Sequence, residues 1–246
     1  MSDPTRPAGP RIIAVANQKG GVGKTTTAIN LAAALAQDGL RVLVLDLDPQ
    51  GNASTGLGVE ASARGLTTYD LLIEDAALAD VVRTTATEKV WLCQPSIDAF
   101  SFDYVLIDCP PSLSLLTVNA MVAAHSVLIP LQAEFFALEG LSQLMLTIRD
   151  IRQTANPALR IEGVVLTMSD SRNNLSQQVE QDARSTLGEV VFRTVIPRNV
   201  RVSEAPSYGL PVTSYDPGSR GSAAYRALAR EFLSRHAGIG TRTKAG

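Results

Sequence analysis

Short apolar runs alternate along this chain with longer segments that have helical periodicity. The apolar runs predict strands at residues 12–16, 41–45, 90–94, 104–107, 126–130, 163–167 and 190–195. A period of about 3.6 residues predicts helices at residues 25–37, 68–74, 113–123, 138–153, 176–187 and 222–234. Nearly continuous apolar strands are typical of a parallel sheet that is buried on both faces. The pattern therefore predicts an α/β fold, with a doubly wound, mostly parallel sheet and helices on both faces.

A single domain over residues 11–236 accounts for these elements, because no repeat or long linker interrupts them. The last predicted helix should dock on the core through one apolar face, formed by Tyr225, Leu228, Ala229, Phe232 and Leu233. Residues 1–10 are polar and proline-rich, without the apolar stretch of a signal peptide, and predict a disordered leader. Residues 237–246 predict a frayed tail.

One connection does not fit a parallel sheet. The strands predicted at 90–94 and 104–107 are separated only by residues 95–103, which cannot supply a crossover helix. Neighbouring parallel strands need a crossover of about a dozen residues or more. Either these strands form a hairpin, or a crossover segment is missing near residues 98–101.

A glycine-rich segment follows the first strand directly and precedes a helix: Lys19-Gly20-Gly21-Val22-Gly23-Lys24-Thr25-Thr26. Glycines let backbone amides converge on phosphate oxygens, and the helix N-terminus adds positive charge. Lys24 would reach the β- and γ-phosphates, and the Thr25 hydroxyl would ligate Mg²⁺. Gln18 replaces the first glycine of the usual pattern, and Lys19 is a second lysine. It either points to solvent or reaches a second nucleotide across an interface.

Acidic residues end two of the predicted strands, on the edge where open α/β sheets bind ligands. Asp46 and Asp48 follow the second strand, and a carboxylate at Asp48 could orient a water for attack on a γ-phosphate. The alternative is that both aspartates only cap the turn. Asp108 ends the run 104–107 and has the form of a Walker B carboxylate, which supports Mg²⁺.

The loop after the last predicted strand combines prolines, an amide and two arginines. Pro197 and Asn199 are candidates for recognition of a nucleotide base, and the arginines for contacts to DNA phosphates. The alternative is a surface loop with solvated charges.

Composition narrows the function classes. The chain of 246 residues is 45% hydrophobic and has no apolar run of transmembrane length. Its formal net charge of -2 argues against general attraction to nucleic acid, so DNA contact needs a local basic patch. Cys93 and Cys109 lack metal-type spacing, which predicts buried free thiols and a reducing cytoplasm.

Together these motifs resemble the ParA/Soj family of partition ATPases, in the deviant Walker A class of P-loop proteins. The resemblance covers nearly the whole chain, and the motifs are similar to those of the chromosomal subgroup of the family. It rests on the segments 19–26, 46–52, 103–112, 135–140 and 196–201.

The resemblance implies an ATP-dependent homodimer that sandwiches two nucleotides, with Lys19 reaching the partner's ATP. The implied ATP and ADP contacts are Lys19, Gly20, Gly21, Val22, Gly23, Lys24, Thr25, Thr26, Met168, Pro197 and Asn199. The implied catalytic residues are Lys19, Lys24 and Asp48. The implied Mg²⁺ ligands are Thr25, Asp48 and Asp108.

Family members bind double-stranded DNA nonspecifically as the ATP dimer. Arg201 and Arg172 match DNA-contacting arginines, and Arg198 and Arg220 are further candidates. A ParB-type centromere-binding partner stimulates slow hydrolysis and so releases the dimer. The resemblance implies a cytoplasmic, nucleoid-associated switch that segregates chromosome or plasmid origins and does not bind membranes.

The chain departs from the family at the short connection. Family members carry a segment between the positions that match Asp98 and Ala99, and it supplies a crossover helix. About 20 residues or more are therefore expected to be missing here.

Three other classes share parts of this pattern. A MinD-like membrane-associated division regulator needs a basic amphipathic C-terminal helix, for which residues 238–244 are too short and glycine-rich. A nitrogenase iron protein-like reductase needs cluster cysteines across the dimer, and only Cys109 lies near the site. A relative that positions a protein cargo would have the same nucleotide and DNA chemistry as a partition ATPase.

Overall fold

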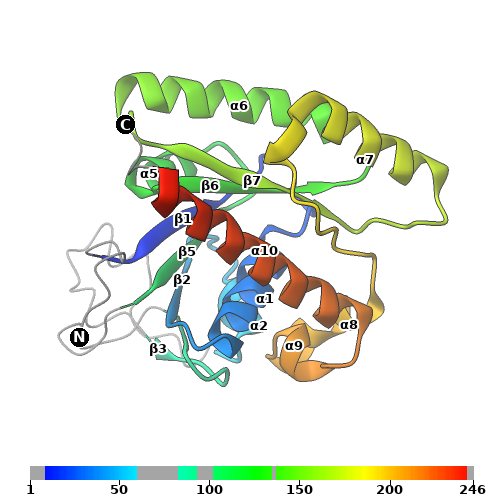
Figure 1. The fold of residues 1–246 in the computed structure, drawn as a ribbon. Helices are drawn as coiled ribbons and strands as arrows, with labels where there is room; N and C mark the ends of the chain where they lie inside the picture. Colours follow the sequence, from blue (N-terminus) through cyan, green and yellow to red (C-terminus); the bar gives the residue numbers. More distant parts are fainter. Residues whose placement is uncertain (1–8, 60–82, 93–101, 135–136, 243–246) are drawn as a thin grey trace.

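The structure, a computed structural model, describes residues 9–59, 83–92, 102–134 and 137–242. These residues form a seven-stranded sheet in the order β3-β4-β2-β5-β1-β6-β7 (Figure 1). The strands are β1 (Arg11–Val15), β2 (Val42–Asp46), β3 (Arg83–Thr84), β4 (Val90–Leu92), β5 (Tyr104–Asp108), β6 (Ser126–Gln132) and β7 (Arg160–Thr167). All neighbouring strands pair in parallel except β3, which lies antiparallel at the edge beside β4. The predicted fold class is confirmed.

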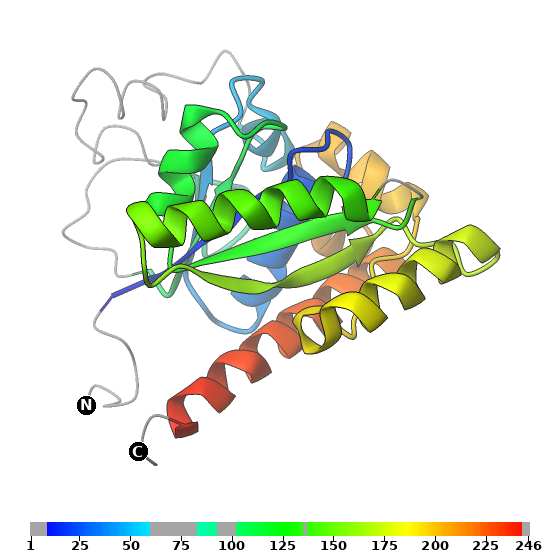
Figure 2. The same cartoon turned by 90° about the horizontal axis from the view of Figure 1, so that it is seen from above.

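Helices cover both faces of the sheet, as Figures 1 and 2 show from two directions. They are α1 (Lys24–Gln37), α2 (Asn52–Gly56), α5 (Leu115–Ala123), α6 (Ala137–Thr154), α7 (Asn174–Leu187), α8 (Val200–Glu204), α9 (Val212–Tyr215) and α10 (Arg220–Arg242). Short 3-10 turns are η3 (Gly188–Val190) and η4 (Ala205–Tyr208). The helix predicted at 68–74 lies outside the described residues.

Alternate strand side chains enter two separate cores. Ile13 and Val15 of β1 pack with α1 and α10, whereas Ala14 and Ala16 pack with α5, α6 and α7. Helix α10 docks through the predicted face, in which Tyr225, Leu228, Ala229 and Phe232 are at most 1% exposed. None of the described helices is long and apolar enough to cross a membrane.

Helix α10 is longer than predicted. It continues to Arg242 instead of ending at residue 234, so the part of the predicted frayed tail up to Arg242 is helical. His236 anchors this extension to the sheet through its two ring nitrogens. They lie 3.0 Å from Oη of Tyr104 and 2.7 Å from Oε1 of Glu162. Sequence periodicity cannot report such a contact between distant residues.

The strand predicted at 190–195 is wrong. The segment passes beside β7 but touches it only at isolated points, such as the bridge between Val164 and Val191. The backbone amides of Phe192 and Ile196 donate to β7 carbonyls, each at 2.8 Å. A continuous ladder does not form.

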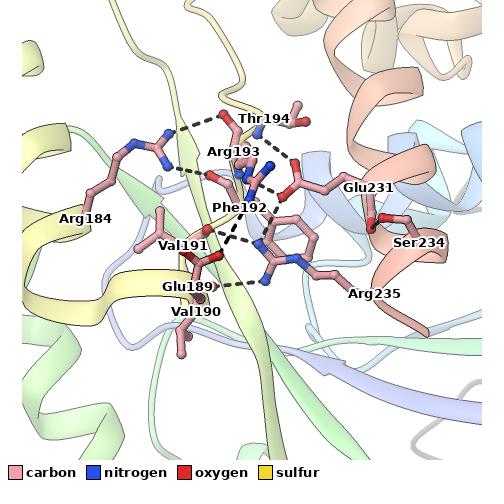
Figure 3. A network of polar contacts seen from close by, with 10 residues as sticks. All are labelled: Arg184, Glu189, Val190, Val191, Phe192, Arg193, Thr194, Glu231, Ser234 and Arg235. Carbon is pink, nitrogen blue, oxygen red and sulfur yellow. Dashed lines mark hydrogen bonds and ion pairs between the residues drawn. The ribbon is translucent and has the colours of Figure 1, made fainter. Parts of the chain in front are cut away.

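Side chains from the flanking helices bind the other backbone groups of this segment (Figure 3). Arg235 of α10 donates to the carbonyls at positions 190 and 191, at 3.4 and 3.0 Å. Arg184 of α7 donates to those at positions 192 and 193, at 3.1 and 3.3 Å. Glu231 of α10 accepts from the amides at positions 193 and 194, both at 2.8 Å. The apolar pattern of this segment therefore reflects its burial. Its backbone is held by side chains of α7 and α10 and not by pairing within the sheet.

The short connection after β4 does not make a hairpin. Both β4 and β5 pair in parallel with β2, which lies between them, so the hairpin alternative is wrong. Residues 93–101, where the missing segment is predicted, lie outside the described residues.

Candidate nucleotide site

The glycine-rich segment leaves the carboxyl end of β1 and enters α1 at Lys24. Gly21 and Gly23 have φ angles of +73° and +86°, which L-residues with a Cβ rarely adopt. This left-handed backbone opens the loop and leaves amides at the N-terminus of α1 without helical acceptors. The predicted phosphate cradle has the expected backbone shape.

Two buried polar side chains fix this loop. Asn17 is 3% exposed; its Nδ2 donates to the Pro130 carbonyl at 2.8 Å, and its Oδ1 accepts from the Lys19 amide at 3.0 Å. Thr167, at the end of β7, donates from Oγ1 to the Val22 carbonyl at 2.9 Å. Sequence reasoning missed both residues. The available signal was a polar side chain at the carboxyl end of a buried parallel strand.

Lys24 lies inside the cradle. Its side chain is nearly buried, and Nζ donates to the Lys19 carbonyl at 3.0 Å. Burial lowers the pKa of Lys24, while the nearby carboxylates of Asp108 and Asp48 oppose this shift. The structure thus brings Lys24 together with both predicted functional aspartates.

Asp108 is a buried carboxylate, and among the described residues neither of its oxygens has a hydrogen-bond partner with suitable geometry. Burial raises its pKa to about 8, and the nearby Thr25 hydroxyl lowers it in part. An orphaned carboxylate beside a threonine hydroxyl is the donor set that Mg²⁺ would satisfy, so these residues fit the ion. Among the described residues, no group of three or more His, Cys, Asp or Glu could hold a metal.

The two aspartates after β2 differ in their surroundings. Asp46 accepts from the backbone amide and hydroxyl of Ser54, at 2.9 and 2.8 Å, and so holds the start of α2. Burial raises the pKa of Asp46. The Asp48 carboxylate accepts from the Gln50 amide at 3.0 Å, and its charge acts on Lys24. Both carboxylates therefore hold backbone amides of the turn, as the capping alternative expects, and the charge of Asp48 also acts on Lys24.

Three of the predicted nucleotide contacts, Met168, Pro197 and Asn199, lie on two adjoining loops. Met168 has a positive φ of 51°, and its Cε is 3.7 Å from where a Cβ on Gly23 would lie. Pro197 is bridged to Ser169 of the same loop. Asn199 accepts from the Val202 amide at 3.4 Å and caps α8. Met168 thus borders the phosphate loop, with Pro197 on the neighbouring strand-like segment.

Lys19 lies on the rim of the cradle and pairs with its own chain. Its Nζ is 3.3 Å from Oε2 of Glu134, with side-chain exposures of 40% and 48%. A groove of about 590 Å³ opens here, lined by Gln18, Lys19, Gly140, Ser142, Gln143 and Leu146. Sequence reasoning missed Glu134, although an acidic residue just past β6 was a usable signal.

The candidate DNA-binding arginines lie on three joined segments. Arg172 follows β7, Arg198 and Arg201 flank the start of α8, and Arg220 begins α10. The Arg198 amide donates to the Ser169 carbonyl at 2.9 Å, which joins the first two segments. Arg172 and Arg201 are both paired with carboxylates, which the sequence did not predict.

Cys109 is a buried free thiol, as predicted, and burial raises its pKa. Cys93 lies outside the described residues.

Comparison with known proteins agrees with this geometry. Residues 13–212 match the model of the CobQ/CobB/MinD/ParA nucleotide binding domain. The chain is 52% identical to a chromosome partitioning protein ParA of Caulobacter vibrioides, covering 92% of this chain and 94% of that protein. It is 46% identical to a chromosome-partitioning ATPase Soj of Treponema pallidum, with coverages of 89% and 95%. A crystal structure of cobyrinic acid a,c-diamide synthase from Mycobacterium smegmatis, with bound ATP analog and magnesium, superposes with a TM-score of 0.76. It is 34% identical, with 91% and 94% coverage.

The Caulobacter match spans 252 residues, which exceeds the 92% of this 246-residue chain that it covers. That relative therefore carries residues within the match that this chain lacks. The matched family, the two partition relatives and the phosphate cradle agree with one another. The chain belongs to the ParA/Soj family of chromosome-partitioning ATPases, within the wider CobQ/CobB/MinD/ParA family of nucleotide-binding proteins.

Proposed function

We propose that this protein is an ATP-dependent switch that partitions DNA. ATP binding drives two subunits into a sandwich dimer, the dimer binds double-stranded DNA without sequence preference, and hydrolysis to ADP releases it. The observation that carries the proposal is the separation of the two lysines. Lys24 is buried inside the cradle, whereas Lys19 lies half-exposed on its rim beside an open groove.

Within one subunit, the chain's own groups hold the nucleotide. The amides of the glycine loop and Lys24 would bind the β- and γ-phosphates, and Thr25, Asp48 and Asp108 would hold Mg²⁺. The bound Mg²⁺ neutralises charge on the phosphates. Asp48 positions the attacking water, since its carboxylate lies half-buried at the strand edge that faces Lys24. Met168, Pro197 and Asn199 border the base.

Between subunits, each Lys19 reaches the phosphates of its partner. Its ion pair with Glu134 is half-exposed, and such pairs contribute only about 0–1 kcal/mol, so a phosphate can displace the carboxylate. Dimerisation therefore depends on the γ-phosphate, and loss of that phosphate dissolves the dimer.

The output of the switch is a doubled basic surface. Arg172, Arg198, Arg201 and Arg220 lie on joined segments, and a dimer presents two copies to one duplex, so affinity grows by avidity. We infer that the protein acts on the cytoplasmic nucleoid, that a ParB-type centromere-binding protein stimulates its slow hydrolysis, and that the result is segregation of replication origins.

A DNA-binding assay tests this proposal. Two labelled duplexes of unrelated sequence are titrated with protein in Mg²⁺ and either ADP or a hydrolysis-resistant ATP analogue. The proposal predicts binding of both duplexes with the ATP analogue and at least tenfold weaker binding with ADP. Equal affinities in the two nucleotides would contradict it.

A further inference from the structure

Arg172, a candidate DNA-binding residue, is held by an acidic neighbour. Its guanidinium makes two parallel bonds to the Asp170 carboxylate, from Nε at 3.0 Å and from Nη2 at 3.1 Å. Asp170 Oδ1 also accepts from the Arg172 amide at 3.0 Å, which fixes the carboxylate in a turn. The Arg172 side chain is 89% exposed and that of Asp170 is 29% exposed. Hydrogen bonds from Arg172 lower the pKa of Asp170 to about 2, so this carboxylate stays charged.

Arg201, the second candidate, is held in the same way. Its Nη1 lies 2.9 Å from Oε2 of Glu204, and its Nε lies 3.3 Å from Oδ2 of Asp216. Oε2 of Glu204 also accepts from the Tyr215 hydroxyl at 3.4 Å. The hydrogen bond to Glu204 raises the pKa of Arg201. Two carboxylates thus surround one cation.

The other two candidate arginines differ. Within the described part of the chain, neither Arg198 nor Arg220 forms an ion pair with a carboxylate within 4 Å. The charge of Arg198 nevertheless acts on Asp170 and helps to lower its pKa. Asp170 therefore lies in the field of both arginines of this loop pair.

We propose that Asp170, together with Glu204 and Asp216, holds the affinity for DNA low by competing with phosphates for Arg172 and Arg201. This inference rests on the proposed function, because it concerns the regulation of the same DNA surface. A phosphate that contacts Arg172 must displace Asp170 or share the cation with it. Each protomer then offers less net positive charge than its arginines suggest, and stable binding requires two protomers on one duplex.

The effect has a calculable upper size. Each neutralised phosphate contributes about 0.9 to the slope of log affinity against log salt. If removing one negative charge per protomer adds one full contact, the dimer's slope steepens by up to about 1.8, and affinity at about 0.1 M salt rises by up to about 60-fold. A threefold gain is the smallest that we take as support.

Asp170→Asn is the direct test, because asparagine keeps the turn-forming oxygen but loses the charge and the second acceptor for Arg172. The matched control is Asp150→Asn on α6, whose carboxylate pairs with the neighbouring Arg149 at 3.8 Å and is 66% exposed. Duplex affinity is measured for the full chain with Mg²⁺ and a hydrolysis-resistant ATP analogue, between about 50 and 200 mM salt. The proposal predicts tighter binding and a steeper slope for Asp170→Asn, and wild-type behaviour for Asp150→Asn. Affinity equal to that of the control, or weaker binding, overturns it.

Two further variants show whether the gain in DNA affinity depends on the arginine that each carboxylate binds. Asp170→Asn combined with Arg172→Ala should lose the gain, whereas a gain that persists would assign it to general charge and overturn the proposal. Glu204→Gln keeps an acceptor for Arg201 and Tyr215 and should also tighten binding at least threefold. Failure of the proposed function would look different, since wild type would then form an ATP dimer without binding DNA at any salt concentration.

Discussion

Glu231 is expected to be a principal stabiliser of the segment 190–195, which leads into the loop with the candidate residues Pro197 and Arg198 (Figure 3). Its carboxylate accepts from two backbone amides at 2.8 Å and from Arg235 at 3.0 Å, and its side chain is only 17% exposed. Glu231→Ala removes all three bonds. In the variant the exposed Arg193 amide can bind water instead, so its bond adds little to the loss of stability. The other two charge-assisted bonds contribute about 1.5 kcal/mol each to the free energy of unfolding. The expected loss is about 3 kcal/mol, or a fall in Tm of about 6–12 °C for a chain of this size.

Glu189→Ala is the control, because Glu189 is 95% exposed and pairs with Arg193 only at 3.8 Å. It should change Tm by less than about 2 °C. Burial alone would raise the pKa of Glu231, but the hydrogen bonds outweigh it and lower the pKa below the ordinary 4.5. A lowered folded-state pKa means that the stabilisation is complete above pH 4.5 and is lost as the pH falls through the folded-state value. The difference between wild type and Glu231→Ala should therefore shrink below that pH. Thermal unfolding followed by circular dichroism measures the fall in Tm and its dependence on pH. Equal Tm values for Glu231→Ala and Glu189→Ala at neutral pH would refute the reasoning.

Three further variants test separate parts of the structure. Asp48→Ala should lower ATP hydrolysis by about 100-fold or more and trap an ATP dimer on DNA; release from DNA as fast as wild type in a dissociation assay would show that its role is misassigned. Arg201→Glu should lose DNA binding but keep ATP dimerisation, whereas Arg149→Glu on α6 should keep both; salt-insensitive binding by Arg201→Glu would contradict the DNA surface. Gly163→Ala should lower the free energy of unfolding by about 1–3 kcal/mol in urea titration, because its Cβ would overlap the ring of buried Phe192. A Gly163→Ala variant as stable as wild type would contradict the close contact between Gly163 and Phe192.

The sequence could predict those parts of the fold that depend on residues close together in the chain. Apolar runs located β1, β2, β5 and β6 to within a residue or two, and the glycine loop and Asp108 followed from position at strand ends. The segment 190–195 was misassigned because its backbone partners, Arg184, Glu231 and Arg235, come from two helices elsewhere in the chain.

The chemistry of the site divides in the same way. Asp46 and Asp48 are two residues apart in sequence, yet Asp46 binds Ser54 at the start of α2, whereas the charge of Asp48 acts on Lys24. The ion pair of Lys19 with Glu134 likewise joins residues that the fold brings together at neighbouring strand ends. Motifs selected the candidate residues, and the tertiary structure shows which groups each candidate contacts.

The central claim is that Lys19 makes dimerisation depend on ATP, and size measurement tests it most directly. Light scattering coupled to gel filtration gives the mass of wild type and Lys19→Ala with Mg²⁺ and either ADP or a hydrolysis-resistant ATP analogue. The account predicts a wild-type monomer of 26.1 kDa with ADP and a dimer with the ATP analogue. Lys19→Ala should stay monomeric in both nucleotides while still binding the analogue. A dimer of Lys19→Ala with the ATP analogue would contradict the account.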